Sequence, residues 1–237
     1  MKIAVCFSGH IRSLPHTYEN IRKNLLEPNS ADVYIHTWDT LGWHYKFDGG
    51  LVDEETDLFY DEILDWLRPV KKIIIENFLS KKFNKHEIIK NTFKHGNTDM
   101  YTFDMANNII GMFYGISASI KMALDSDIEY DCIVRCRPDI VFRDIINIED
   151  FFDTKHLFIR PDDKHIDLDG VQGGVDDIFA IGSPENMKKY ADVISHLDDF
   201  VAENPDFFPE KTLYNYLHST DINMLRYDAN YSIIRPR

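Results

Sequence analysis

The sequence predicts an α/β fold in which a mostly parallel, twisted sheet is flanked by helices. Short apolar runs alternate with longer segments whose apolar residues recur every three or four positions, a pattern typical of strands alternating with helices. Polar residues follow several of the apolar runs directly, as they do at strand ends in such sheets. The length of 237 residues suits one large domain. We therefore expect a single domain over residues 1–237, with an aromatic and acidic insertion at residues 40–69.

The first part of the chain is expected to alternate strands with helices. A helix at residues 15–26 follows the first strand, and Pro15 suits its first turn. The insertion contains a short helix near residues 57–67, and the polar residues 77–102 are expected to form a loop with a short helix. The expected strands of this part span residues 2–7, 32–37 and 70–76.

The second part begins with a long helix at residues 103–124, where the apolar residues form one stripe at helical spacing. Ser183, Pro184 and Glu185 signal another helix start, with a capping side chain, a proline in the first turn and an acid beside it. A glycine- and aspartate-rich loop at residues 166–177 precedes that element. The expected strands span residues 131–142, 157–159, 178–181 and 227–234, the last of which closes the sheet, and a further helix begins near residue 209.

Charge composition excludes one class of partner. Lysine and arginine together number 26, against 40 aspartate and glutamate residues, which gives a net charge of −14. A protein this acidic does not present the basic surface that nucleic acids require, so we expect no nucleic-acid partner. A local cluster of arginines is correspondingly more informative, since the average field of the protein repels anions.

Cysteine content and hydropathy indicate the compartment. Three cysteines are too few for a disulfide framework, and Cys132 and Cys136 share one strand at a spacing that does not allow a bridge, so we expect a reducing, cytoplasmic setting. We find no signal peptide and no apolar run of the ~20 residues that a membrane span needs. Peripheral membrane contact stays possible through the pairs Lys71-Lys72 and Lys81-Lys82, although such pairs are commonly a solvated face.

The strand at residues 131–142 becomes charged at one end. Arg135, Arg137 and Asp139 stand at alternate positions, so in an extended chain they point to the same side. The two guanidinium groups suit a phosphate, and the carboxylate suits a metal ion or a sugar hydroxyl. An internal Arg–Asp ion pair that fixes the strand end is an equally open interpretation. If the arginines bind a phosphate, replacing Arg137 with alanine should weaken that binding and leave the melting temperature nearly unchanged.

The turn after the first strand also has the composition of an anion site. Ser8 and Gly9 precede a helix, the glycine permits close backbone approach, and Arg12 adds a fork of donors beside His10. A tight turn with a surface arginine is the alternative interpretation.

Polar residues follow the second strand as well. There Trp38 offers an aromatic surface for a base or a sugar ring, and Asp39 offers a carboxylate for a ribose or sugar hydroxyl. In the alternative interpretation Trp38 fills the core and Asp39 caps a turn.

Acidic residues and a histidine in the last third complete the candidate site. Asp176 and Asp177 follow Gly173-Gly174, so one of these carboxylates can act as general base for an acceptor hydroxyl on a loop that closes over a ligand. A turn with solvated acids is the alternative. His218 follows a helix near the C-terminus and is a candidate second ligand for a metal ion at Asp139.

Four matches, the last of which has two segments, together resemble the nucleotide-sugar-dependent glycosyltransferases of the GT-A fold, in particular small bacterial or viral enzymes of polysaccharide synthesis. The motifs are residues 3–12, residues 112–116, Arg135-Cys136-Arg137-Pro138-Asp139, residues 176–182 and residues 209–213. The resemblance implies a GT-A-like single domain that moves a sugar from a nucleotide-diphosphate sugar to the hydroxyl group of a carbohydrate acceptor. It also implies that the loop after the first strand contacts the nucleotide, and that an Asp-x-Asp element holds a divalent metal ion against the diphosphate.

The chain departs from that family pattern at one position. Asp139 matches the last aspartate of the Asp-x-Asp element, but Arg137 stands where the first would be. Asp139 can bind Mn²⁺ or Mg²⁺ with water and phosphate ligands, or the arginines can neutralise the diphosphate directly, and we expect the metal. In an inverting reaction Asp176 or Asp177 would be the base. The alternative functions are a non-catalytic sugar- or partner-binding relative, and a sulfotransferase-like transferase, although residues 8–13 contain no lysine.

Overall fold

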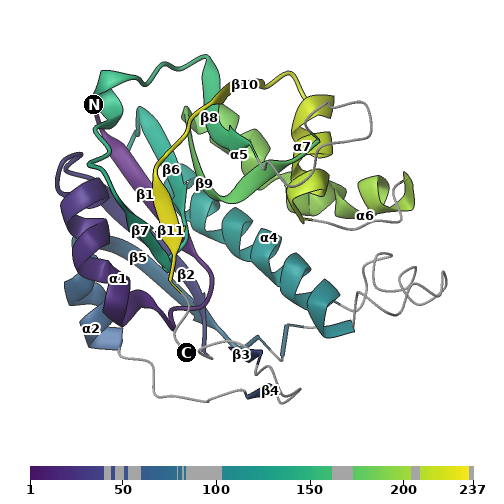
Figure 1. Ribbon diagram of the computed structural model, residues 1–237, viewed down its shortest axis with the longest axis horizontal. Coiled ribbons are helices and arrows are strands. Elements are labelled where there is room, and N and C mark those ends of the chain that lie inside the picture. Colours follow the sequence, from purple (N-terminus) through teal and green to yellow (C-terminus); the bar gives the residue numbers. More distant parts are fainter. Residues whose placement is uncertain are drawn as a thin grey trace.

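A seven-stranded sheet forms the centre of the molecule (Figure 1). The computed structural model describes residues 1–39, 44–45, 51–52, 60–78, 80–81, 83, 103–161, 173–203 and 209–234. In spatial order the strands are β10 (Asn223–Arg226), β8 (His156–Pro161), β9 (Val175–Gly182), β6 (Cys132–Cys136), β1 (Ile3–Ser8), β2 (Asp32–Trp38) and β5 (Val70–Glu76). Strand β9 is antiparallel to both of its neighbours, and every other adjacent pair is parallel. The predicted α/β fold with a mostly parallel sheet is confirmed.

The central strands are buried on both faces, which explains their continuous apolar sequences. All residues of β1, β2 and β6 are buried. Strands covered on both sides lose the alternation of polar and apolar residues that a half-exposed strand shows. The same burial makes the polar residues within them, such as His36 and Arg135, informative about function.

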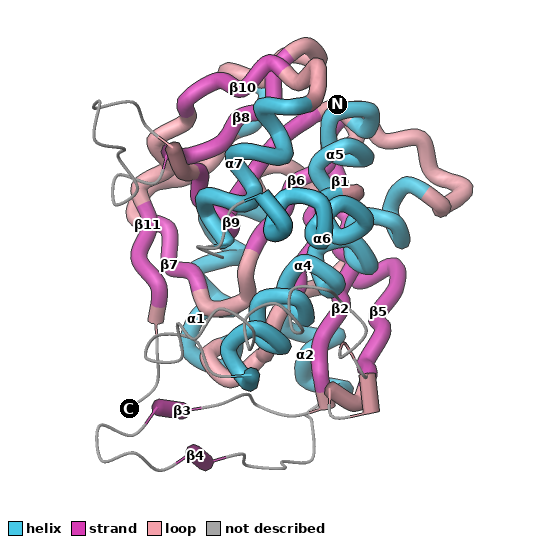
Figure 2. Tube along the Cα trace, turned by 90° about the vertical axis from the view of Figure 1, so that its right-hand side faces the viewer, coloured by secondary structure: helices cyan, strands magenta, loops and turns pink. Residues whose placement is uncertain are grey.

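Helices cover both faces of the sheet. One face packs against α4 (Phe103–Leu124), α5 (Pro184–Ala191), α6 (Val193–Glu203) and α7 (Pro209–Ser219), which Figure 2 views from in front of the sheet. The other face packs against α1 (Leu14–Ile21), its π-helical extension η1 (Arg22–Leu26), the 3₁₀ turn η2 (Ile148–Asp150) and α2 (Tyr60–Trp66). Each layer contributes one of the two hydrophobic clusters of the core. Within the described residues no helix is both long and apolar enough to cross a bilayer.

The strand expected at residues 131–142 is divided in two. Strand β6 ends at Cys136, and β7 (Ile140–Phe142) leaves the main sheet to pair antiparallel with β11 (Tyr231–Ile233). Pro138 lies at the break and has no N–H group for a sheet hydrogen bond. The expectation that residues 227–234 close the main sheet is therefore corrected, because β10 occupies its edge and β11 forms a separate ribbon with β7.

Parts of the predicted loops lie outside the described residues. In the insertion, β3 (His44–Tyr45) pairs with β4 (Leu51–Val52), and Trp66 of α2 stacks on Tyr18 of α1 with ring centroids 5.0 Å apart. Most of residues 40–59 and 77–102, and residues 162–172, which include the first part of the glycine- and aspartate-rich loop, are not described.

The parallel strands β1, β2, β5 and β6 present their carboxyl ends at one edge of the sheet (Figure 1). Helix α4 crosses this region against β1 and β2. Two of its glycines allow close packing, because a Cβ atom on Gly115 would lie 3.1 Å from Nδ1 of His36 and one on Gly111 would lie 2.7 Å from the ring of Phe78. Ile234 also reaches this edge, where its N–H donates to the carbonyl oxygen of Asp139 over 2.8 Å.

Candidate functional site

A cavity of about 270 Å³ opens at the carboxyl edge of the sheet, beside helix α4. Its wall contains residues from three strand ends: Ser8, Gly9, His10 and Arg12 after β1, Trp38 at the end of β2, and Arg135, Arg137 and Asp139 at the end of β6. The structure thus brings together residues that lie more than 120 positions apart in the chain. All of them were predicted as ligand-binding or metal-binding residues, whereas the four other predicted site residues do not line this cavity.

Arg135 is the most unusual residue of the wall, because its guanidinium group is buried without a carboxylate partner. The residue is 0% exposed, and Nη1 donates to the carbonyl oxygens of Ser8, over 3.3 Å, and of Cys136. Among the described residues its Nε has no hydrogen-bond partner and the side chain makes no ion pair. Burial lowers the pKa of Arg135 from its usual value, although Tyr190, Asp177 and Cys136 act in the opposite direction. A buried cation in this state is costly unless an anion joins it.

Arg137 and Asp139 form a bidentate ion pair at the cavity. Nε of Arg137 donates to Oδ1 of Asp139 over 2.8 Å, and Nη2 donates to Oδ2 over 2.5 Å. Burial alone would lower the pKa of Arg137, but the pair with Asp139 outweighs it and raises that pKa above its usual value. The Asp139 side chain is 4% exposed and the Arg137 side chain 24%. The ion-pair interpretation of the sequence is therefore correct, and the same two residues nevertheless line the cavity.

The turn after β1 contributes both backbone and side chains to the wall. Gly9 has φ +123°, a conformation that favours glycine, and its carbonyl oxygen accepts a hydrogen bond from Oγ1 of Thr37 over 2.9 Å. Ser8 is 2% exposed, and within the described part of the chain its hydroxyl group has no partner. Helix α1 begins only at Leu14. The residues at the cavity therefore belong to the end of β1 and the turn that follows it, not to the N-terminus of the helix.

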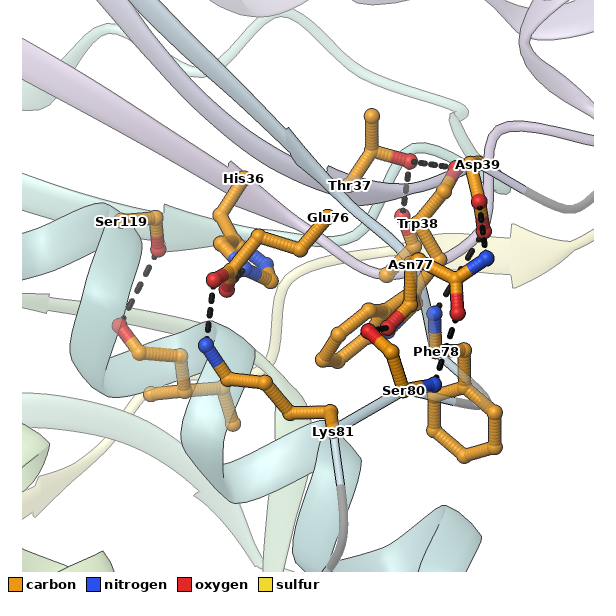
Figure 3. A network of polar contacts seen from close by, with 12 residues as sticks. His36, Thr37, Trp38, Asp39, Glu76, Asn77, Phe78, Ser80, Lys81 and Ser119 are labelled. Atoms are coloured by element: carbon orange, nitrogen blue, oxygen red, sulfur yellow. Dashed lines mark hydrogen bonds and ion pairs between the residues drawn. The ribbon is translucent and has the colours of Figure 1, made fainter.

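The two residues predicted after β2 have different surroundings. Trp38 is 2% exposed and packs edge-on against His36 and Phe78, with ring centroids 4.9 and 5.0 Å apart, while also lining the cavity. Asp39 instead accepts hydrogen bonds from Nδ2 of Asn77 over 2.6 Å and from the N–H of Phe78 over 3.4 Å (Figure 3). It caps the turn after β5, as in the alternative interpretation, and does not line the cavity.

Five further residues line the cavity that were not predicted as site residues, and one of them is Pro138 between Arg137 and Asp139. Asn108, Ile109 and Met112 come from α4, and Phe78 follows β5. Positions 108, 109 and 112 lie on one face of a helix. The apolar stripe of residues 103–124 was read only as a core-facing surface. A polar Asn108 beside that stripe was the signal available in the sequence.

A polar network lies beside Trp38, whose ring contacts that of His36 (Figure 3). Nε2 of the fully buried His36 is 2.9 Å from Oε2 of Glu76, and Nζ of Lys81 pairs with Oε1 of the same carboxylate. Lys81 also lies 4.2 Å from the centroid of the Tyr114 ring. Burial lowers the pKa of His36 despite the carboxylate, which favours the neutral ring. The network fixes the ends of β2 and β5 against helix α4.

Asp176 and Asp177 lie in strand β9 and not on a flexible or solvated loop. They are 9% and 6% exposed. Asp176 accepts a hydrogen bond from the hydroxyl group of Tyr231 and another from the N–H of Ile178 over 2.8 Å, and burial raises its pKa to about 6. Asp177 acts electrostatically on Arg135 and Arg137, so it lies near the arginines although it is not part of the cavity wall.

The expected metal ligands do not form a metal site in this arrangement. His218 is exposed on α7, where it stacks on Tyr214 with ring centroids 5.7 Å apart, and it does not line the cavity. Both oxygens of Asp139 accept hydrogen bonds from Arg137. Within the described ranges no group of three histidine, cysteine, aspartate or glutamate side chains is placed to hold a metal ion. A single carboxylate that faces a guanidinium group does not fit the oxygen-rich donor set of Mn²⁺ or Mg²⁺.

No protein-family model matches this chain, and no curated protein matches it in sequence.

Proposed function

We propose that this protein is a glycosyltransferase that moves a sugar from a nucleotide-diphosphate sugar to a hydroxyl group of a carbohydrate acceptor. The observation that carries the proposal is Arg135, a fully buried guanidinium group on the wall of an open cavity with no carboxylate in an ion pair with it among the described residues. A diphosphate bound in the cavity would supply the missing negative charge.

Charge supports an anionic ligand. The protein carries a net charge of −14, yet Arg12, Arg135 and Arg137 share one cavity with a single carboxylate, that of Asp139. The two buried polar atoms of the wall that lack a partner within the described residues are Oγ of Ser8 and Nε of Arg135. Both can donate a hydrogen bond to a phosphate oxygen. Unpaired buried donors are costly, so a ligand that satisfies them gains affinity.

The apolar part of the lining supports a nucleotide over a simple inorganic anion. Trp38, Phe78, Ile109 and Met112 provide aromatic and apolar surface, and Asn108 provides an amide that both donates and accepts hydrogen bonds. Ligand sites of this kind combine an apolar lining with a few polar groups that fix orientation. A base can pack on the apolar side while its diphosphate lies among the arginines.

The chemistry of the proposed reaction needs positive charge where the bond breaks. The bond between the sugar C1 atom and the diphosphate oxygen breaks, the acceptor oxygen forms the new bond to C1, and the acceptor proton passes to a base. Guanidinium groups beside the departing diphosphate stabilise the negative charge that develops on it. For an inverting reaction the sequence offers Asp176 and Asp177 as the base, but neither lines the cavity, and both oxygens of Asp176 already accept hydrogen bonds.

Among the alternatives, a sulfotransferase-like activity is disfavoured by the composition of the wall, which includes no lysine among the described residues. A non-catalytic sugar-binding protein would use the same cavity without turnover. Binding and turnover must therefore be measured separately.

Calorimetric titration tests the binding part of the proposal. Uridine and guanosine diphosphates should bind, and the corresponding nucleosides should bind at least tenfold more weakly, since they lack the group that pairs with the arginines. The variant Arg135→Met should lose at least tenfold in diphosphate affinity. Incubation with a panel of nucleotide-diphosphate sugars should then release free diphosphate slowly. Absence of binding to every nucleotide would overturn the proposal, and binding without any release or transfer would favour the non-catalytic alternative.

A further inference from the structure

The geometry points to a diphosphate site that works without a divalent metal ion, in which Asp139 is a positioning residue for Arg137. On this inference Asp139 holds one edge of the guanidinium group, and the other edge of that group takes the place of the metal ion at the diphosphate. The inference rests on the proposed function and defines how the same cavity neutralises its ligand.

The contact between the two residues leaves most of the guanidinium donors available. A guanidinium group carries five N–H donors. Asp139 occupies the edge formed by Nε and Nη2 with two hydrogen bonds. No hydrogen bond from Nη1 of Arg137 occurs among the described residues. Because Asp139 fixes the plane of the group, the free edge is already oriented before a ligand arrives, and little entropy is lost on binding.

Exposure decides which charge an incoming ligand meets. The Asp139 side chain is 4% exposed, whereas the Arg137 side chain is 24% exposed. The carboxylate is therefore shielded, and the positive group forms the accessible part of the pair. A metal ion approaching from the cavity encounters a guanidinium group first, while a phosphate encounters unpaired N–H donors.

The rest of the wall carries donors suited to phosphate oxygens and few acceptors suited to a cation. Arg135 contributes a buried Nε, and Ser8 a buried hydroxyl group, that have no partners within the described residues. Arg12 adds a third arginine side chain. Divalent cations of this class select oxygen ligands, mainly carboxylates, carbonyls and water. Arginine forks instead match the geometry of phosphate oxygens and form two parallel hydrogen bonds to them.

The decisive experiment compares diphosphate affinity with and without metal ions in the unmodified protein. Uridine diphosphate and guanosine diphosphate are titrated calorimetrically in excess EDTA and again in millimolar MnCl₂. We expect dissociation constants that agree within about threefold, because the arginine charges do not depend on the buffer. A gain of tenfold or more with Mn²⁺ would overturn the inference and leave the proposed function intact. Failure to bind either nucleotide in both buffers would overturn the proposed function, and the inference with it.

Two variants test the positioning role of Asp139. Arg137→Lys keeps the charge but removes the fork, and should weaken diphosphate binding at least tenfold in both buffers. Asp139→Asn keeps the shape but not the charge that holds the guanidinium group, and should weaken binding about three- to tenfold, again equally in EDTA and MnCl₂. If Asp139 were a metal ligand, Asp139→Asn would remove only the Mn²⁺-dependent part of the affinity, and Arg137→Lys would change little.

The chain contains a matched control for these variants. Arg226 and Asp228 have the same spacing and also form an ion pair, in which Nε of Arg226 donates to both carboxylate oxygens over 3.0 and 2.7 Å, but they are exposed and do not line the cavity. Arg226→Lys and Asp228→Asn should leave diphosphate affinity unchanged. The comparison of buffers in the unmodified protein remains decisive even if a cavity variant fails to fold.

Discussion

Asp139 and Arg137 depend on each other for stability as well as for ligand binding. Because Asp139 is 3% exposed, Arg137→Ala leaves a buried carboxylate without its cation. We expect this variant to lose about 3–5 kcal/mol in free energy of unfolding. The sequence alone had suggested a nearly unchanged melting temperature, since it did not reveal how deeply Asp139 is buried.

A second substitution in the same pair separates the loss of charge pairing from the loss of packing. In the Arg137→Ala background, Asp139→Asn removes the unpaired charge and should recover more than half of the lost stability. Urea unfolding of the two single variants and the double variant measures this directly. Equal stability of Arg137→Ala and the unmodified protein would show that the ion pair does not stabilise the fold.

Asp176 predicts a pH dependence of stability that can be assigned to one residue. Burial raises its pKa from 3.8 to about 6, so the fold favours the protonated form. Its stabilising contribution is complete below pH 3.8 and is lost as the pH rises through 6. Asp176→Asn should therefore gain about 2 kcal/mol at pH 7 and almost nothing at pH 4. Urea unfolding of both proteins across this range measures the difference, and parallel stability curves would contradict it.

His36 affects the pH dependence of stability with the opposite sign. This contribution cancels when the unmodified protein is compared with Asp176→Asn. Burial lowers the pKa of His36, so its stabilising contribution is present above the unfolded value near 6.5 and is lost as the pH falls through the folded pKa. This dependence is common to the unmodified protein and the Asp176→Asn variant. The difference between their unfolding curves therefore isolates the carboxylate.

Predictability of the candidate site depended on where each residue lies relative to a strand end. Ser8, Arg12, Arg135 and Arg137 were found because residues at the carboxyl ends of parallel strands share one edge. Asp39 and His218 were misplaced, since spacing in the sequence does not say whether a side chain caps its own turn or faces outward. The helix residues of the wall were missed because an apolar stripe serves the core and a cavity equally well.

At the level of whole elements, periodicity predicted the long helix and the buried strands, but it did not predict where strands change partners. Helix α4 spans the expected residues 103–124. The strand at residues 131–142 is interrupted because Pro138 cannot donate to the sheet, which turns the charged segment out of the sheet at the cavity. Strand order depends on contacts between distant segments, and local sequence patterns carry no signal for them.

The close packing of α4 on the sheet makes Gly115 a sensitive position. A Cβ atom there would lie 3.1 Å from Nδ1 of His36 and 3.4 Å from Cβ of Ser8, and His36 is held by Glu76. Alanine normally favours a helix over glycine by about 1 kcal/mol. We nevertheless expect Gly115→Ala to lower the free energy of unfolding by about 1–2 kcal/mol, because the buried ring cannot move freely.

A control in the same helix separates packing from helix propensity. Ala118 is half-buried in α4, so Ala118→Gly measures the propensity cost of about 1 kcal/mol with little change in packing. Thermal and urea unfolding of both variants give the comparison. A stabilised Gly115→Ala protein would mean that helix α4 does not need the close approach to β1 and β2.

For the molecule as a whole, the cavity lined by Arg12, Arg135 and Arg137 is a basic region in a strongly acidic protein. A net charge of −14 disfavours anions at long range, although salt screens exposed charges over about 8–10 Å. The arginines must therefore act at contact distance, inside a cavity where the local dielectric is low. The ligand-free protein therefore bears the free-energy cost of burying the Arg135 charge, and a bound anion offsets that cost.

That coupling predicts opposite effects of one substitution on stability and on binding. At about one hundred times its dissociation constant, a diphosphate should stabilise the folded protein by about 2.7 kcal/mol, which raises the melting temperature by roughly 5–10 °C in a chain of this size. Arg135→Met removes a buried cation that has no ion-pair partner among the described residues. Its ligand-free melting temperature should therefore equal or exceed that of the unmodified protein. At the same nucleotide concentration, the nucleotide-induced rise should fall to about half or less in this variant, in line with an affinity that is at least tenfold weaker. Differential scanning calorimetry with and without uridine diphosphate measures both values, and a variant that unfolds earlier yet keeps the ligand-induced rise would assign Arg135 to the fold and not to the ligand.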